Sequence, residues 1–147
     1  MIGSIEHTIE KRDVPTPGSM VIFTGVVKDP TGNILLRKSD IASADFAVME
    51  RIIDSSGIQR LEPKEIPWQP LLSDEYDLFD ELQPKGQIST CDYTFRYQPS
   101  GDRWPMFSGL GKYEVWFRFK RHDTTEDDIR LIYVVNVGGV SGVRRLE

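Results

Sequence analysis

The chain contains very little cysteine. Cys91 is the single cysteine among its 147 residues, so no disulfide can form within the chain. Small secreted domains usually depend on disulfides, and this sequence does not fit that class. Cys91 begins an alternating segment on the same side as Tyr93 and Phe95. We therefore expect its thiol to be a small buried hydrophobic group and not a nucleophile.

Long apolar runs are also missing. A membrane-spanning helix needs roughly 20 consecutive apolar residues, and no segment approaches that length. Residues 1–7 have neither the basic start nor the apolar stretch of a signal peptide. The hydrophobic content of 39% and the charged content of 28% are ordinary for a soluble globular protein. We expect one domain that neither enters a membrane nor follows the classical secretory route.

Positive charge is scarce as well. The formal net charge is −5 and the sequence pI is about 5.1. A nucleic-acid-binding domain needs a basic field, and the pair Arg144-Arg145 is too short to supply one. We therefore expect no nucleic-acid partner.

The sequence lacks the motifs of common catalytic and metal sites. Its two histidines, His7 and His122, lie in no motif, and no G-x-S-x-G, Walker A or H-E-x-x-H pattern occurs. Acidic residues cluster in segments 74–81 and 126–128, but neither has the spacing of a calcium-binding loop. A solvated acidic surface explains these clusters better. We expect no catalytic residue, no cofactor and no bound metal.

What the sequence does contain is a clear period of two. Apolar and polar residues alternate in segments 91–97 and 112–120, and the odd positions of segment 129–137 are all apolar, which predicts strands with one buried face. The β-branched and aromatic residues of segment 20–28 predict another strand, followed by a turn over residues 29–33. Gly32 or Asn33 can take positive φ in that turn, and a short return strand follows at residues 34–36.

Two regions are harder to interpret. We expect segments 44–53 and 58–61 to be paired strands, with a helix over residues 43–53 as an open alternative. Prolines at 63, 67, 70 and 84 argue against a long central strand or helix between residues 62 and 86. Ser73 could cap one or two helical turns over residues 74–82. This region is therefore predicted to be a long, partly helical connection.

Together these patterns predict an all-β fold. About seven strands separated by turns indicate an antiparallel β-sandwich, with a small β-barrel as the alternative. Tyr113 follows Gly111 at the start of the penultimate strand, where immunoglobulin-like sandwiches place their tyrosine corner. We assign residues 1–14 to an N-terminal arm, 15–137 to the sandwich and 138–147 to a flexible C-terminal tail. The tail could also add a strand to a neighbour's sheet.

Three tryptophans are the candidate binding residues. Strict alternation directs Trp116 to the face opposite Val115 and Phe117, whereas Trp68 and Trp104 stand in proline-flanked segments that we expect to be loops. Exposed aromatic residues anchor protein interfaces or stack on sugar rings. The alternative is that each tryptophan covers an edge of its own sandwich.

Two stretches of the chain resemble the immunoglobulin-like domains of tailed-bacteriophage structural proteins. The first is Pro17-Gly18-Ser19 leading into Phe23-Thr24-Gly25-Val26-Val27-Lys28-Asp29 and Gly32-Asn33, and the second is Gly111-Lys112-Tyr113-Glu114-Val115-Trp116-Phe117. The resemblance covers roughly residues 15–137. It implies a non-enzymatic virion subunit of the neck, tail, baseplate or capsid surface, assembled in the host cytoplasm. Such a subunit forms homo-oligomers and packs against other virion proteins. A carbohydrate- or surface-binding sandwich module is the alternative function.

Overall fold

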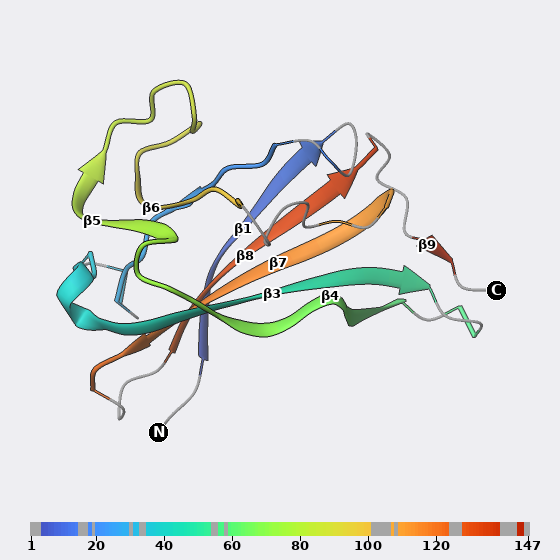
Figure 1. The fold of residues 1–147 in the computed structure, drawn as a ribbon, viewed down its shortest axis with the longest axis horizontal. Helices are drawn as coiled ribbons and strands as arrows, with labels where there is room; N and C mark the ends of the chain where they lie inside the picture. Colours follow the sequence, from blue (N-terminus) through green and yellow to red (C-terminus); the bar gives the residue numbers. More distant parts are fainter. Residues whose placement is uncertain are drawn as a thin grey trace.

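The chain is described here from a computed structural model (Figure 1). The described residues are 4–14, 18, 20–29, 31–32, 35–53, 56–57, 59–100, 107, 109–123, 128–138 and 144–145. For residues 4–12, 14, 53, 59–67 and 144–145 the description covers the backbone alone. No helix in these ranges is long and apolar enough to cross a membrane.

Two β-sheets form the fold. The larger has the strand order β1-β8-β7-β3-β4, with β9 also paired to β3, and the smaller has the order β2-β6-β5. The β1–β8 and β3–β9 pairings are parallel and the others are antiparallel. The elements are β1 (Ser4–Val14), β2 (Phe23–Gly25), the 3-10 helix η1 (Lys38–Asp40), β3 (Ile41–Ile53), β4 (Gln59–Leu71), β5 (Tyr76–Gln83), β6 (Tyr93–Tyr97), β7 (Gly111–Arg121), β8 (Asp128–Val137) and β9 (Arg144–Arg145).

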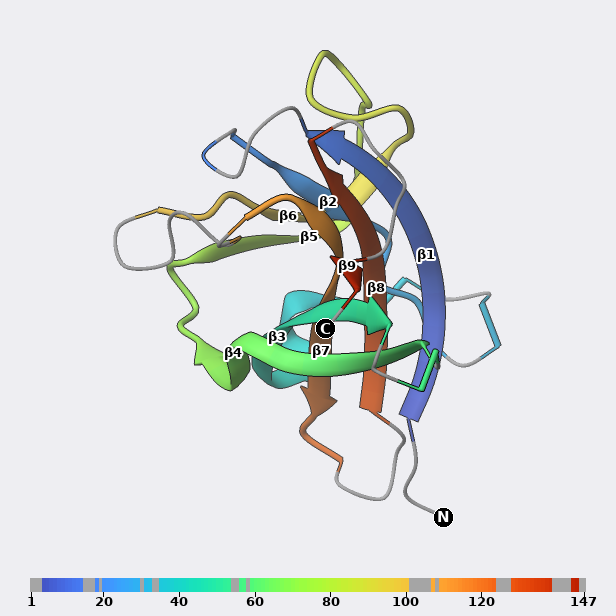
Figure 2. The same ribbon diagram turned by 90° about the vertical axis from the view of Figure 1, so that its right-hand side faces the viewer.

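The sheets stack as two layers around one aromatic core (Figure 2). Phe117 of the large sheet lies 5.4 Å from Phe23 and 5.0 Å from Phe95 of the small sheet, measured between ring centroids. All three side chains are fully buried. The predicted all-β sandwich is therefore confirmed. No strand pairing among the described residues closes the sheets into a barrel.

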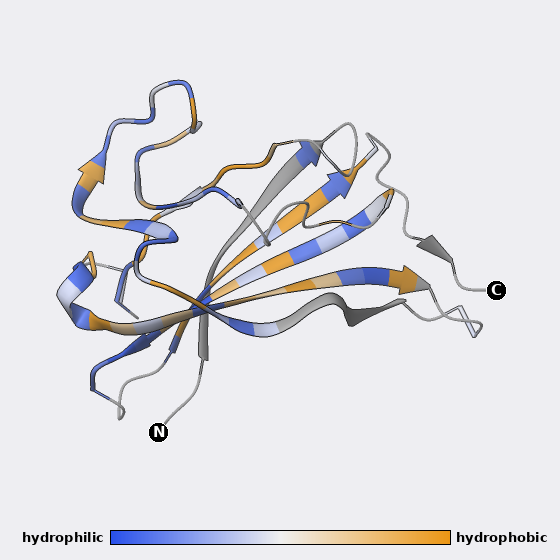
Figure 3. Cartoon of the chain, viewed as in Figure 1, coloured by the Kyte–Doolittle hydropathy of each residue, from blue (hydrophilic) through white to orange (hydrophobic). Residues whose placement is uncertain are grey.

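Strands β7 and β8 show most clearly why these residues form a sandwich. Apolar and polar residues largely alternate along β7, whereas β8 is apolar over most of its length (Figure 3). Val115 and Phe117 of β7 and Leu131 and Tyr133 of β8 are fully buried in the core. The strands predicted at 112–120 and 129–137 are thus confirmed, and their hydrophobic faces hold the two layers together.

Residues 44–53 form a strand, so the helical alternative for this region is wrong. They belong to β3, which pairs with β7 on one side and with β4 on the other. Ala44, Phe46, Val48, Glu50 and Ile52 are buried, and their spacing of two puts them on one face of the sheet. The predicted pairing with segment 58–61 is confirmed by the register Ile53↔Gln59.

The predicted helical connection over residues 62–86 is wrong, because β4 and β5 occupy most of it. Strand β4 is the last strand in the order of its sheet, where one side needs no ladder hydrogen bonds. Its register shifts between Phe46/Val48 and between Val48/Glu50 of β3, and these bulges contain Pro67 and Pro63. The bulges accommodate prolines that a regular ladder would exclude.

Residues 76–82 belong to strand β5 and residues 74–75 to the turn before it, so the expected helical turns over 74–82 are not formed. Leu78 is buried and lies opposite Phe95 in the register, and the Tyr76 ring centroid lies 6.1 Å from that of Phe95. Tyr76 and Leu78 therefore pack with the two-residue spacing of a strand. The helical prediction failed because the pairing with β6 does not follow from the local sequence. The turn before β5 is closed by Glu75, whose Oε1 accepts a hydrogen bond from the Leu72 backbone N–H at 2.9 Å.

The N-terminal segment is not an arm. Strand β1 runs parallel to β8 from Ser4↔Asp128 to Val14↔Val137, so residues 4–14 are part of the large sheet. Within the predicted tail, Arg144 and Arg145 pair with Ile52 and Ile53 of the same chain. Strand β7 makes its last pairing with β3 at Arg51, and β9 continues the ladder from there. The rest of segment 139–147 lies outside the described residues.

Cys91 is exposed, so the prediction of a buried thiol is wrong. Strand β6 begins at Tyr93, because Ser89 closes a local turn before it. The Ser89 hydroxyl donates to the Cys91 carbonyl at 2.5 Å and accepts from the Cys91 N–H at 3.3 Å.

The strand predicted at 20–28 is shorter than expected, and β2 covers residues 23–25. A single antiparallel bridge, Lys28↔Leu35, forms the hairpin that follows. Gly32 has φ +76° in this turn, as predicted, whereas Asn33 lies outside the described residues.

Tyr113 anchors the start of β7. Its ring is buried, and its hydroxyl donates a hydrogen bond to the Gly109 carbonyl, four residues earlier, at 3.0 Å. The phenol thereby fixes the entry of the chain into the core strand.

Candidate functional site

The outer face of the large sheet carries the candidate site. Along β7, Trp116 and Arg118 point away from the core, since Val115, Phe117 and Phe119 fill it. In the register, Trp116 lies between Ala47 of β3 and Ile132 of β8. Both neighbours are almost completely buried although they are on the outer face. Larger side chains therefore cover this part of the sheet.

Trp68 provides part of that cover. Its ring packs edge-on against Trp116, with 6.4 Å between ring centroids and an interplanar angle of 69°. The prediction that Trp68 lies in a loop is wrong, because it belongs to strand β4. Pro67 and Trp68 form the bulge opposite Ala47, which places the indole beside Trp116.

Two arginines stack on the tryptophans. The guanidinium carbon Cζ of Arg118 lies 4.1 Å from the centroid of the Trp68 ring. Cζ of Arg130, on β8, lies 5.6 Å from the Trp68 centroid and 5.5 Å from that of Trp116. A cation over an aromatic face is attracted by the ring quadrupole. We call the surface formed by Trp68, Trp116, Arg118 and Arg130 the Arg–Trp face.

The two arginines face each other across the sheet. Arg118 and Arg130 are directly paired in the β7–β8 register, where like charges repel. Asp45 compensates Arg118, with Oδ2 at 2.7 Å from Nη2 and 3.2 Å from Nε. Among the described side chains no carboxylate forms an ion pair with Arg130, and its buried Nε has no hydrogen-bond partner there.

Glu114 fixes the orientation of Trp116. Its Oε1 accepts a hydrogen bond from Trp116 Nε1 at 3.0 Å, and its Oε2 accepts one from Arg51 Nε at 2.6 Å. The Glu114 carboxylate is buried, so both hydrogen bonds lie largely out of water. The indole of Trp116 is therefore held in one position on a rigid strand.

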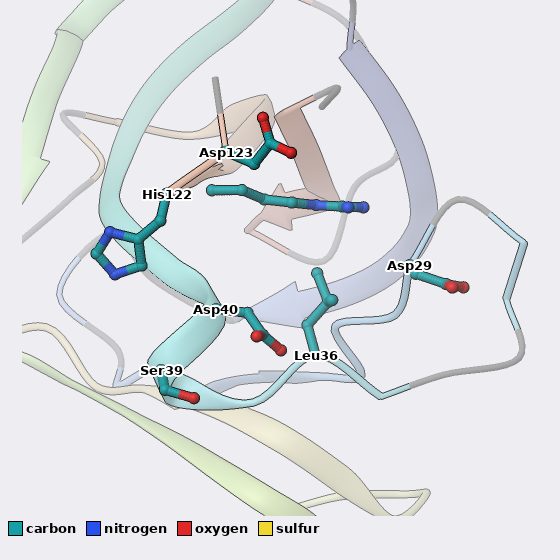
Figure 4. A pocket seen from close by; sticks show the side chains of 7 residues that line it. Asp29, Leu36, Ser39, Asp40, His122 and Asp123 are labelled. Carbon is teal, nitrogen blue, oxygen red and sulfur yellow. The ribbon is translucent and has the colours of Figure 1, made fainter. Parts of the chain in front are cut away.

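A pocket beside the 3-10 helix η1 is the second candidate site (Figure 4). It has a volume of about 380 Å³ and is lined by Asp29, Leu36, Ser39, Asp40, Arg121, His122 and Asp123. Figure 4 shows the imidazole of His122 directed away from the carboxylates of Asp40 and Asp123. Asp40 Oδ2 accepts a hydrogen bond from the Arg37 N–H at 2.9 Å, so this carboxylate closes the 3-10 turn. In the described part of the chain, no group of three or more His, Cys, Asp or Glu side chains could hold a metal ion.

The structure brings together two of the three predicted interface tryptophans. Trp68 and Trp116 are in contact, whereas Trp104 lies outside the described residues. Sequence reasoning did not single out Arg118 and Arg130. Alternation along β7 and β8 places both on the same face as Trp116, so their positions could have been predicted. No protein-family model matches the chain, and no curated protein sequence matches it either.

Proposed function

We propose that the protein is a non-enzymatic assembly subunit that binds other protein subunits through the Arg–Trp face. The observation that carries the proposal is the Trp68–Trp116 pair, held by Arg118 above and by Glu114 beside it. Tryptophan and arginine are the residue types that most often dominate interface energies. Because β-strands and hydrogen bonds already order these side chains, a partner would lose little conformational entropy on binding.

We also propose that the sandwich is immunoglobulin-like. The order β8-β7-β3 matches the G-F-C sheet of that fold, and β2-β6-β5 matches its B-E-D strands. The hydrogen bond from Tyr113 to the Gly109 carbonyl has the form of a tyrosine corner. Domains of this architecture serve many unrelated functions, so the fold supports a binding role without specifying it.

Within that class we propose a structural subunit of a tailed-phage virion. The support is the resemblance of residues 17–29 and 111–117 to phage immunoglobulin-like domains. The second of these segments opens β7, the strand that carries Trp116 and Arg118. An assembly role and the Arg–Trp face are thus connected through the same strand.

The alternative of carbohydrate binding receives less support from the geometry. A sugar ring stacks on an open aromatic face, but the Arg118 guanidinium already lies 4.1 Å from the Trp68 ring. Trp116 contacts the same indole edge-on. The pair therefore offers less flat apolar surface than a sugar platform requires.

Native mass spectrometry and electron microscopy test the proposed function. We expect the wild-type protein to form multimers or to associate with particles, and Trp116→Ala to reduce that association. Ile88→Ala is the matched control, because Ile88 is an exposed apolar residue outside the Arg–Trp face. A strictly monomeric protein that binds glycans on an array would contradict the proposal, as would unchanged association of Trp116→Ala.

A further inference from the structure

We propose that the Arg–Trp face binds the acidic margin of β5 in a second copy of the chain, so that copies associate head to tail. This inference rests on the proposed function, since it names the partner of the same face.

The Arg–Trp face lies in a positively charged region of an acidic protein. The cations that point outward from β3, β7 and β8 outnumber the carboxylates, among the described residues. The cations are Arg51, Lys112, Arg118, Lys120 and Arg130, and the carboxylates are Asp45, Glu114 and Asp128. Glu114 is already bonded to Arg51, and Asp45 to Arg118 with Lys120 at 3.7 Å. The net positive charge therefore remains to be matched by a partner.

The opposite charge gathers on β5 and on the turn before it. We call the exposed residues Leu72, Asp74, Asp77, Asp80, Glu81 and Leu82 the acidic margin. Leu72 and Leu82 are 63% and 48% exposed. Asp77 is 3.5 Å from Arg96, but its side chain remains 53% exposed. The margin thus offers carboxylates for arginines and apolar groups for tryptophans.

The positions of the two surfaces imply a head-to-tail contact. The acidic margin borders the small sheet, in which β5 is a terminal strand of the order β2-β6-β5. The Arg–Trp face is on the large sheet, on the side turned away from the small sheet, and Figure 2 shows the two layers. One copy can therefore use its face while its own margin stays free. Such heterologous contacts produce closed rings or open filaments.

Arg130 gives this contact a specific role. A carboxylate from the margin of the next copy would neutralise the charge that stands opposite Arg118. Arginine and carboxylate form short, charge-assisted hydrogen bonds, and these can be bidentate. Exposed ion pairs are screened by salt, so the association is expected to weaken as ionic strength rises.

Mixing two variants tests the inference. The face variant is Arg130→Gln/Lys112→Gln, and the margin variant is Asp74→Lys/Glu81→Lys. Neither Asp74 nor Glu81 has a side-chain hydrogen bond among the described contacts, so the margin variant should fold normally. Each variant alone is expected to self-associate at least about tenfold more weakly than wild type, because interfacial charges are removed or reversed. An equimolar mixture should form a one-to-one complex, since one intact face then meets one intact margin.

Native mass spectrometry and sedimentation velocity measure these species, and circular dichroism confirms that each variant is folded. Lys112→Gln alone replaces the face variant if the double substitution lowers the melting temperature strongly. A mixture that remains monomeric, or single variants that associate like wild type, would overturn the head-to-tail contact. The Arg–Trp face itself would survive that result if Trp116→Ala still reduced association. Unchanged association of Trp116→Ala would instead refute the proposed function.

Discussion

Gly25 gives the sharpest test of how the two sheets pack. A Cβ atom at position 25 would lie 2.6 Å from the hydroxyl oxygen of Tyr133 and 2.9 Å from Leu131 Cδ1. Both residues belong to the opposite sheet and are fully buried. The Tyr133 hydroxyl also donates a 2.6 Å hydrogen bond to the Thr24 carbonyl. Neither side chain can move away without losing contacts, so Gly25→Ala is expected to destabilise the fold.

The size of the effect follows from three contributions. Overpacking a filled core costs about 1–3 kcal/mol. Displacing the Tyr133 hydroxyl removes a hydrogen bond worth about 1 kcal/mol. Replacing glycine lowers the entropy of the unfolded chain and returns about 0.4–1 kcal/mol. The net loss is therefore about 1–3.5 kcal/mol, which lowers the melting temperature by roughly 2–14 °C for a chain of this length.

Urea denaturation measures this loss as a lower midpoint at an unchanged m-value. Gly109→Ala is the matched control, because nothing lies within 4 Å of a Cβ at that position. Adding Tyr133→Phe to Gly25→Ala removes the atom in closest contact, so the double variant should lose less stability than the sum of the single variants. If Gly25→Ala were as stable as Gly109→Ala, the described approach of the two sheets would be wrong.

Three further predictions concern Tyr113, Tyr76 and the tryptophan pair. Tyr113→Phe should cost about 1 kcal/mol in urea denaturation, because the Gly109 carbonyl loses its donor; equal stability would remove the support for a tyrosine corner. Burial raises the pKa of the Tyr76 hydroxyl, so folding favours the protonated phenol. The resulting contribution to the free energy of unfolding is complete below the ordinary tyrosine pKa and is lost as pH rises through the raised value. An ultraviolet pH titration of wild type and Tyr76→Phe measures this, and no late-ionising tyrosine in the difference would contradict it. A double-mutant cycle of Trp68→Ala and Trp116→Ala should give a coupling of about 0.5–1.5 kcal/mol, and additive losses would show that the rings do not interact.

The central strands could be predicted from the sequence because each has one face against the core. The apolar odd positions of β7 and β8 identify the residues that face the core, and alternation along β7 also directs Trp116 outward. The part of β4 after residue 61 could not be recognised, because the positions of Pro63 and Pro67 in bulges depend on the register with β3. β1 was missed for a related reason. Its parallel partner β8 is more than a hundred residues away, and local sequence does not show that pairing.

The candidate site depends on the alternation in β7, on the bulge in β4 and on the small side chain of Ala47, and these features differ in how far the sequence predicts them. Alternation places Trp116 and Arg118 on the outer face, and this could be predicted. The bulge that places Trp68 opposite Ala47 could not, because it exists only in the register with β3. Ala47 is completely buried under the indoles, and a larger residue at that position would displace Trp68.

These features separate what stabilises the face from what would attract a partner. The tryptophans are held by contacts within the chain, namely Glu114, Arg118 and the small side chain of Ala47. Their substitution should therefore lower both stability and association. Arg130 has no ion pair among the described side chains, and within the chain its neutralisation would weaken only the stacking on Trp68 and Trp116, so association should change more than stability. If substitutions at Arg130 lowered stability and association to the same extent, Arg130 would hold the sheet together and would not recognise a partner.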